Sequence, residues 1–221
     1  MSFTTSGCLL AVAAIALSSF PFSSGCSCFR SNVHLQDLFC NAKYVLEVIV
    51  TGDKIIKSRD PFGFDQRRYD ITTTRVYKRS PEYDALTSKN HIFTATNSAA
   101  CGVFLEEGVK YLILGTPRNG RISLNLCQHG LYRKADLINE ELQCNLDYGF
   151  SQNCDKCKIQ YCDEPGSCDQ QQIDLRTCVF DQVDTQATCI HEYAHCKSVA
   201  YRCVWSDSGS GKLDTCLNVE E

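Results

Sequence analysis

Short apolar runs separated by polar turns fill most of the first half of the chain. Five of these runs cover residues 43–51, 67–78, 91–96, 109–116 and 121–127. They are rich in Val, Ile, Leu, Phe, Tyr and Thr and have the length of strands. A Pro-Arg-Asn-Gly sequence at 117–120 predicts a tight turn between the last two. Because no βαβ pattern occurs, the strands predict a mainly β fold built on a small, closed, five-stranded barrel of the OB type.

Two helices are predicted to flank this barrel. Residues 34–41 suit a short helix, and residues 131–144 place apolar side chains near helical spacing. Residues 52–66 contain Gly, Pro and several charges, so we expect an exposed loop between the first two strands. Aromatic residues on the predicted strands are expected in the core rather than in a ligand site; they include Tyr44, Tyr69, Phe93 and Tyr111.

The amino-terminal end has the pattern of a signal peptide. An apolar run from Leu9 to Phe20 precedes the small residues Ser23 and Gly25, which suit the signal-peptidase pocket. The run is too short to span a bilayer, which takes roughly 20 apolar residues. We therefore expect residues 1–25 to be removed, no membrane span, and a protein secreted to the extracellular space or matrix that begins at Cys26.

Cysteine usage agrees with export. The 221 residues include 16 cysteines, and such density is typical of oxidising compartments. Cys8 lies in the leader, so 15 remain and at least one has no partner within the chain. Residues 26–153 hold six cysteines and residues 154–216 hold nine. This contrast predicts a core-bearing first domain over 26–154 and a small disulfide-rich second domain over 155–221.

The net charge of the chain excludes some classes of binding partner. The net charge of −4 argues against a general nucleic-acid or anionic-membrane binder. The basic pair Arg67 and Arg68 is interpreted as a solvated strand face. No Asn-x-Ser/Thr triplet occurs, so no N-linked sugar is expected.

A cysteine at a new amino terminus has specific chemistry. The α-amino nitrogen and the carbonyl oxygen of Cys26 would close a five-membered chelate ring on one metal ion, and a nearby disulfide would hold that chelate rigid. Considered alone, Cys26 and Cys28 are better explained as disulfide cysteines that fix a terminus to a barrel, because most cysteines of secreted proteins are structural.

The ordered motifs of the chain decide between these interpretations. Together they resemble the tissue inhibitors of metalloproteinases. The matching pieces are Cys26-Ser27-Cys28 directly after the leader, His34-Leu35-Gln36-Asp37-Leu38-Phe39-Cys40, Ser98-Ala99-Ala100-Cys101-Gly102, Leu126-Cys127, Cys157-Lys158-Ile159-Gln160-Tyr161-Cys162, and Cys196 with Cys203-Val204-Trp205. The resemblance covers nearly the whole mature chain and implies a netrin-like barrel of the OB type followed by a cysteine-rich domain.

The resemblance also implies a pairing of the cysteines. The implied bonds are Cys26 to Cys101, Cys28 to Cys127, Cys40 to Cys154, Cys157 to Cys203, Cys162 to Cys168 and Cys178 to Cys196. Cys144, Cys189 and Cys216 fall outside the family's pattern. One arrangement pairs Cys189 with Cys216 and leaves Cys144 free.

The function implied by the resemblance is inhibition of matrix metalloproteases and related zinc endopeptidases, not catalysis. Cys26 would bind the zinc of the target protease, so the chain needs no cofactor of its own. Ser27 would enter the target's main specificity pocket, and the second domain is a candidate contact for protease zymogens. The implied contact residues are Cys26, Ser27, Cys28, Phe29, Asn97, Ser98, Ala99, Ala100 and Cys101.

Two features leave alternatives open. His191-Glu192-Tyr193-Ala194-His195 fits the H-E-x-x-H pattern, in which two histidines one helical turn apart bind zinc and the glutamate is a general base. The pattern lies in the cysteine-dense part without a long amphipathic helix, so we expect a histidine pair in a solvated, stapled hairpin. A zinc protease that uses these residues is therefore the less favoured alternative. Phe29 and Arg30 stand where a small residue and a proline are common in the family, so the range of inhibited proteases is left open. The remaining alternative is a netrin-like binding module without inhibitory action, which would not need Cys26 to be the free terminus.

Overall fold

The computed structural model describes Cys26 and residues 33–59, 64–127, 132–162, 174–181 and 186–219. The predicted signal peptide, residues 1–25, lies outside the described residues. The main sheet consists of β1 (Tyr44–Ile56), β2 (Gln66–Arg79), β3 (His91–Ala95), β4 (Lys110–Gly115), β5 (Ile122–Ser123) and β6 (Tyr132–Lys134).

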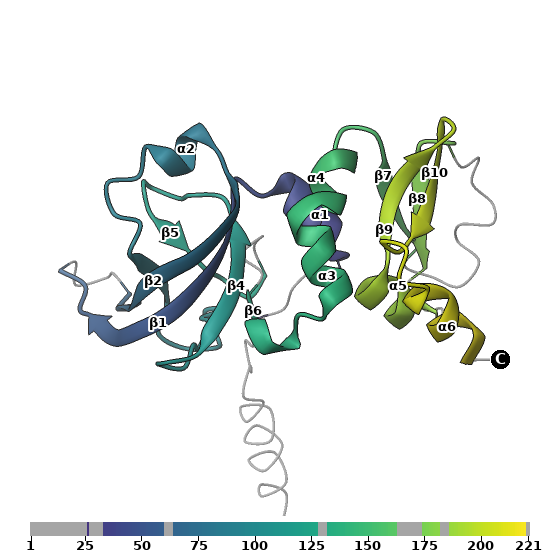
Figure 1. The fold of residues 1–221 in the computed structure, drawn as a ribbon. Coiled ribbons are helices and arrows are strands. Elements are labelled where there is room, and N and C mark those ends of the chain that lie inside the picture. Colours follow the sequence, from purple (N-terminus) through teal and green to yellow (C-terminus); the bar gives the residue numbers. More distant parts are fainter. Residues whose placement is uncertain are drawn as a thin grey trace, which may run out of the picture.

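The main sheet has the order β5-β3-β2-β1-β4-β6. β1 is central and pairs antiparallel with β2 and β4, so that Tyr44 lies opposite both Arg79 and Gly115. The pairing of β1 with β2 shifts register at three places, and such bulges bend a strand and increase its twist. The sheet therefore curls into a half-barrel (Figure 1), which confirms the predicted mainly β, barrel-like class.

Both faces of the central strands are buried, which explains why they are apolar almost throughout. Tyr44, Leu46, Val48 and Val50 point into the curl of the sheet and join its inner core. Val45 points to the other face, where an outer core also contains Leu35, Phe39, Leu112, Leu114, Leu142, Leu146 and Phe150. A strand that feeds two cores loses the simple alternation of a half-buried strand.

A layer of short helices covers the outer face. It contains α1 (Leu35–Asn41), η1 (Ala135–Leu137), α3 (Glu140–Cys144), the π-helical turn η2 (Asn145–Gly149) and α4 (Phe150–Asn153), whereas α2 (Pro81–Asp84) lies at the end of β2. Figure 1 shows α1, α3 and α4 between the sheet and the carboxy-terminal part of the chain. The helical layer therefore contacts both parts.

The carboxy-terminal unit is small and rich in disulfides. It contains a parallel pair, β7 (Lys158–Cys162) with β8 (Thr177–Asp181), an antiparallel hairpin, β9 (His195–Val199) with β10 (Arg202–Ser206), and the helices α5 (Ala187–Tyr193) and α6 (Lys212–Val219). Its buried centre is built largely from the cysteines Cys157, Cys178, Cys196 and Cys203. The carboxy-terminal unit therefore uses disulfides where a larger domain would use apolar side chains.

Two predicted segments are corrected by the structure. The helix predicted over 131–144 is wrong at its start, because residues 132–134 form β6 on the edge of β4, and Asn139 caps α3 through a 2.8 Å bond from the Leu142 N–H to its side chain. The loop predicted over 52–66 is too long. β1 and β2 continue as a hairpin to the pair Ile56 and Gln66, with a 2.7 Å ion pair between Arg67 and Asp53 across the strands.

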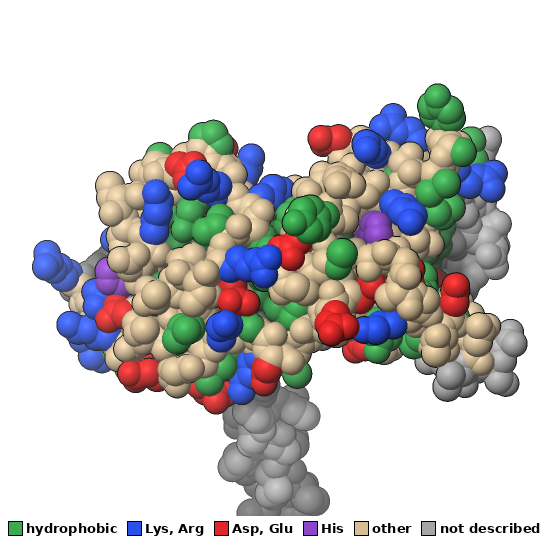
Figure 2. Space-filling model, viewed as in Figure 1, with side chains coloured by type: hydrophobic (Ala, Val, Ile, Leu, Met, Phe, Trp, Pro, Cys, Tyr) green, Lys and Arg blue, Asp and Glu red, His purple; other side chains and the backbone are tan. Residues whose placement is uncertain are grey.

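The surface carries mixed charge. Figure 2 shows acidic and basic side chains interspersed on the visible face, in keeping with the small net charge. Among the described helices, none has both the length and the apolar character required to cross a bilayer.

Candidate functional site

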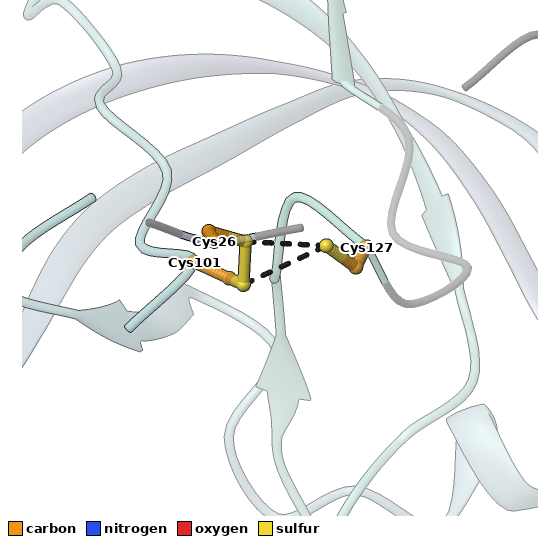
Figure 3. Close-up of side chains that lie close together, drawn as sticks. All are labelled: Cys26, Cys101 and Cys127. Atoms are coloured by element: carbon orange, nitrogen blue, oxygen red, sulfur yellow. Dashed lines mark hydrogen bonds between the residues drawn. A yellow bond between two sulfur atoms is a disulfide. The ribbon is translucent and has the colours of Figure 1, made fainter. Parts of the chain in front are cut away.

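A disulfide joins Cys26 to the loop that follows β3. Cys26 is bonded to Cys101, with their Cα atoms 5.1 Å apart. Figure 3 shows the Cys127 sulfur beside this bond, 3.2 Å from the Cys26 sulfur and 3.6 Å from the Cys101 sulfur. Three segments that are far apart in the sequence therefore meet at Cys26.

The clustered sulfur atoms are not metal ligands. Among the described residues, groups of three potential ligand side chains within metal-binding distance occur at this cluster and at Cys157, Cys196 and Cys203. All of these cysteines are in disulfides, and metal binding by cysteine requires a thiolate.

The loop next to Cys26 is exposed yet internally bonded. Residues 97–100 are exposed. The Ala100 N–H donates to Asn97 Oδ1 at 2.8 Å, and the Cys101 N–H donates to the Ser98 carbonyl at 3.0 Å. These bonds close a compact turn that presents short side chains to solvent. We call residues 97–101 the Asn97 loop.

A shallow pocket lies beside the Asn97 loop. Its volume is about 300 Å³, and its lining is Phe64, Asp65, Ala95, Thr96, Asn97 and Ala100. The Phe64 side chain is 90% exposed. Asp65 accepts bonds from Lys57 Nζ at 2.6 Å and the Ser58 N–H at 3.1 Å, and these bonds lower the pKa of its carboxyl group. Phe64 and Asp65 belong to the segment predicted as a loop, and no sequence pattern indicates the pocket.

The remaining predicted contact residues lie outside the described part of the chain. These residues are Ser27, Cys28 and Phe29. Cys127, the expected partner of Cys28, is disulfide-bonded, and its partner is not among the described residues. The same holds for Cys162, whose expected partner is Cys168.

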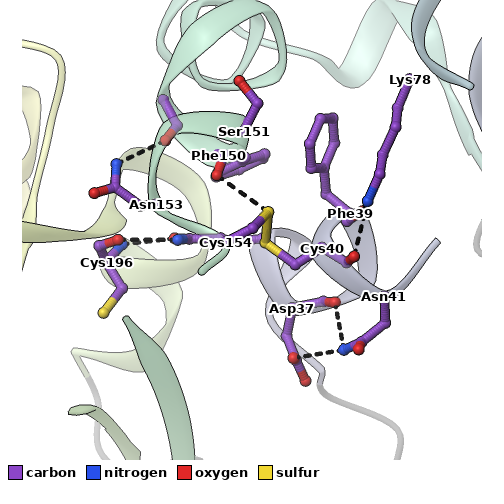
Figure 4. The surroundings of a disulfide bond; sticks show 12 residues. Asp37, Phe39, Cys40, Asn41, Lys78, Phe150, Ser151, Asn153, Cys154 and Cys196 are labelled. Carbon is purple, nitrogen blue, oxygen red and sulfur yellow. Dashed lines mark hydrogen bonds between the residues drawn. A yellow bond between two sulfur atoms is a disulfide. The ribbon is translucent and has the colours of Figure 1, made fainter. Parts of the chain in front are cut away.

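The other expected disulfides are present. The structure contains Cys40–Cys154, Cys157–Cys203 and Cys178–Cys196, together with Cys189–Cys216. Among the described cysteines, Cys144 is free and exposed. Figure 4 shows that the Cys40–Cys154 bond ties α1 to the end of α4, where Lys78 Nζ also donates to the Cys40 carbonyl at 2.8 Å.

The H-E-x-x-H pattern does not form the zinc site of a protease. α5 ends at Tyr193 and its C-cap, Ala194, is extended, so His191 lies on a helix and His195 on β9. The two rings are therefore not one helical turn apart. The expectation of a solvated pair is also wrong, because His195 is 6% exposed. Burial, followed by the charge of Lys197, lowers the pKa of His195.

The histidine pattern instead belongs to the contact between α1 and the carboxy-terminal unit. His34, the N-cap of α1, is fully buried, and its ring centroid lies 4.8 Å from that of Trp205 and 5.6 Å from that of His191. Gln36 makes two bonds to the backbone of Cys196. We call the contact made by these five residues the α1 joint. The sequence pattern did not predict this contact; its only signal was His34 and Gln36, two polar residues on either side of the apolar Leu35 at the start of the helix.

Comparison with known proteins identifies the family of the chain. The family model described as tissue inhibitor of metalloproteinase matches residues 24–205. Metalloproteinase inhibitor 3 of Gallus gallus is 30% identical over 141 residues, which are 63% of this chain and 61% of the relative. Metalloproteinase inhibitor 2 of Cavia porcellus is 32% identical over 169 residues, which are 73% and 72% of the two chains.

Metalloproteinase inhibitor 2 of Homo sapiens is 33% identical over 146 residues, 63% of this chain and 62% of the relative. The chain thus spans about three fifths of the length of several relatives that it matches. The family model extends over both the sheet and most of the carboxy-terminal unit. This protein therefore belongs to the tissue inhibitor of metalloproteinase family.

Proposed function

We propose that the chain is a secreted inhibitor of zinc metalloproteases, without catalytic activity, that blocks the zinc of its target with the amino terminus of the mature protein. The observation that carries this proposal is the Cys26–Cys101 disulfide, which joins the expected terminus to an exposed loop. Family membership supports the target class, since the relatives are metalloproteinase inhibitors by name.

The chemistry follows from the open coordination position of a catalytic zinc. Such a zinc has three protein ligands and a bound water that becomes the nucleophile. After removal of residues 1–25, the α-amino nitrogen and carbonyl oxygen of Cys26 would displace that water. An α-amino group has a pKa near 8, and zinc favours its neutral form, so we expect inhibition to weaken as the pH falls.

The contact surface would be a ridge of two segments. Cys26 to Phe29 would form one side, and the Asn97 loop would form the other. Ser27 would enter the main specificity pocket of the target, and Phe29 would add an apolar contact. The exposed turn over 97–100 supports this proposal because its side chains are short and its backbone is already ordered.

The domain roles follow the same division. We propose an inhibitory domain over 26–154 and an accessory domain over 155–221. The accessory domain is the candidate contact for protease zymogens. The mixed surface charge supports a protein partner rather than a nucleic acid.

The decisive experiment is a titration of processed protein into the catalytic domain of a matrix metalloprotease with a peptide substrate. A matched variant carries one additional alanine before Cys26, which removes the free amine from the zinc while leaving the fold intact. We expect stoichiometric inhibition by the processed protein and loss of inhibition with the extended form. Lack of inhibition across a protease panel would favour a netrin-like binding module instead.

A further inference from the structure

The residue that follows the Asn97 loop, Gly102, packs closely against the backbone of the loop. Gly102 is buried directly after Cys101. A Cβ atom at this position would lie 2.4 Å from the Ala95 carbonyl oxygen and 2.7 Å from the Asn97 carbonyl oxygen. Both obstacles are backbone atoms, which cannot swing aside as a flexible side chain does. Only glycine therefore allows this close approach to the end of β3.

Asn97 closes the same loop from the solvent side. Its Oδ1 accepts the Ala100 N–H at 2.8 Å, and its carbonyl oxygen accepts the Gly102 N–H at 2.9 Å. The residue between these two acceptor contacts, Cys101, has φ of +58°, in the left-handed region that L-residues rarely adopt. The two bonds of Asn97 thus hold Cys101 in a conformation that it would not keep alone.

Further bonds fix the loop to the barrel. The Val103 N–H donates to Thr94 Oγ1 at 2.9 Å, and Thr94 is 5% exposed on β3. The Leu126 N–H donates to the Cys101 carbonyl oxygen at 3.0 Å. The backbone of Cys101 is therefore held on both sides before any partner arrives.

We infer that Gly102 and Asn97 are positioning residues for inhibition: they fix the Cys101 end of the disulfide and thereby the place and direction of Cys26. This inference rests on the proposed function. Gly102 is buried and has no side chain, so it acts through Cys101 and not by touching a protease. Fixing the chelating terminus in advance reduces the ordering cost of binding.

The test compares two alanine variants at glycines. Gly102→Ala introduces the clash described above. Gly120→Ala is the control. Gly120 has φ of +70° and nothing within 4 Å of an added Cβ, so the substitution strains the backbone of a turn without a clash and outside the Asn97 loop. Both variants are checked for intact disulfides and by thermal unfolding. Inhibition constants, association rates and dissociation rates are then measured with one matrix metalloprotease.

We expect Gly102→Ala to raise the inhibition constant about tenfold or more, with faster dissociation, and Gly120→Ala to remain within about twofold of the wild type. Equal inhibition constants for the two folded variants would overturn the inference while leaving the proposed function standing. A processed wild-type protein that does not inhibit would overturn the proposed function and this inference with it.

A second pair of variants applies if Gly102→Ala does not fold. Asn97→Ala removes the Oδ1 acceptor, whereas Asn97→Asp keeps it. Asn41→Ala, which truncates an exposed asparagine at the end of α1 and outside the proposed contact surface, is the control for truncation of a side chain. We expect a loss of about tenfold for Asn97→Ala and recovery to within about threefold for Asn97→Asp. An Asn97→Ala inhibition constant equal to that of Asn41→Ala would contradict the role given to Asn97.

Discussion

His34 is a histidine whose surroundings require the neutral ring. Its Nδ1 accepts the Gln36 N–H at 3.2 Å, and its Nε2 lies 3.2 Å from the Ile190 carbonyl oxygen, which fixes the proton on Nε2. Burial, and then the neighbouring His191 and His195, lower the pKa of His34 to about 3. A proton on Nδ1 would displace the helix-capping bond and place a charge among rings.

Stability should therefore decline in acid. Because the pKa of His34 is lower in the fold than its ordinary value of 6.5, its contribution is complete above pH 6.5 and is lost as the pH falls towards 3. We expect the free energy of unfolding to fall by about 2 kcal/mol between pH 6 and pH 4 from this group. Urea unfolding at several pH values measures it.

The control for this pH dependence is His34→Asn, which keeps a side chain that caps helices well but does not titrate. The variant should be less stable at pH 7 and show a shallower loss of stability towards pH 4. Parallel pH profiles for the two proteins would contradict the assignment to His34.

At the scale of elements, α1 connects the two parts of the molecule. Its apolar face enters the outer core of the sheet through Leu35 and Phe39, and Cys40 bonds it to α4. Its first turn faces the other way, where Gln36 Nε2 donates to the Cys196 carbonyl at 2.9 Å and Gln36 Oε1 accepts the Cys196 N–H at 2.6 Å. One helix of two turns therefore contacts both the sheet and the carboxy-terminal unit.

Removing this connection should be costly. Gln36 is 2% exposed, so Gln36→Ala leaves the N–H and carbonyl of Cys196 buried without partners. We expect a loss of about 2–4 kcal/mol in the free energy of unfolding. Asn41→Ala is the control, because the Asn41 side chain bonds Asp37 at the exposed end of the same helix and its loss should cost below about 1 kcal/mol. Similar losses of unfolding free energy for both variants would contradict a stabilising role of the Gln36 bonds to Cys196.

Helices and strands were predictable from the sequence where their own apolar spacing determines them, without a contact to a distant segment. The strands predicted within residues 43–51, 67–78, 91–96 and 109–116 and the helix at residues 34–41 follow from apolar spacing and are confirmed. Of the strand predicted over 121–127, only Ile122–Ser123 forms, and it pairs in parallel with β3. The start of α3 was mispredicted because β6 forms only through pairing with the edge of β4, a contact between distant segments. The burial of His195 was missed for the same reason: a segment far away in the sequence approaches it, since a Cβ atom added at Gly149 would lie 3.5 Å from His195 Cδ2.

At the scale of the whole molecule, cysteine pairing defines the framework. The structure contains five disulfides between described residues, and one of them, Cys189–Cys216, joins α5 to α6. That bond was only one arrangement among several in the sequence, since no spacing rule selects it. The resemblance to a family supplied the expected place of Cys26 beside residues 97–101, which composition alone does not give.

The unpaired cysteine, Cys144, can be identified by its chemical reactivity. Cys144 is exposed and outside any disulfide, so an alkylating reagent should label it in the native, non-reduced protein. We expect one label per chain, located at Cys144 by peptide mass mapping, and none in Cys144→Ser. A label at Cys127 or Cys162 would contradict the pairing expected for the remaining cysteines.

Trp205 gives the α1 joint an optical signal. It is the only tryptophan of the chain, and its indole N–H donates to the Val179 carbonyl at 2.6 Å while its ring lies against His34. Indole emission moves to longer wavelength when water reaches the ring. The intrinsic tryptophan fluorescence of this protein therefore reports on the α1 joint, where its two parts meet. It distinguishes separation of the two parts from unfolding of the sheet, whose aromatic residues include tyrosines but no tryptophan.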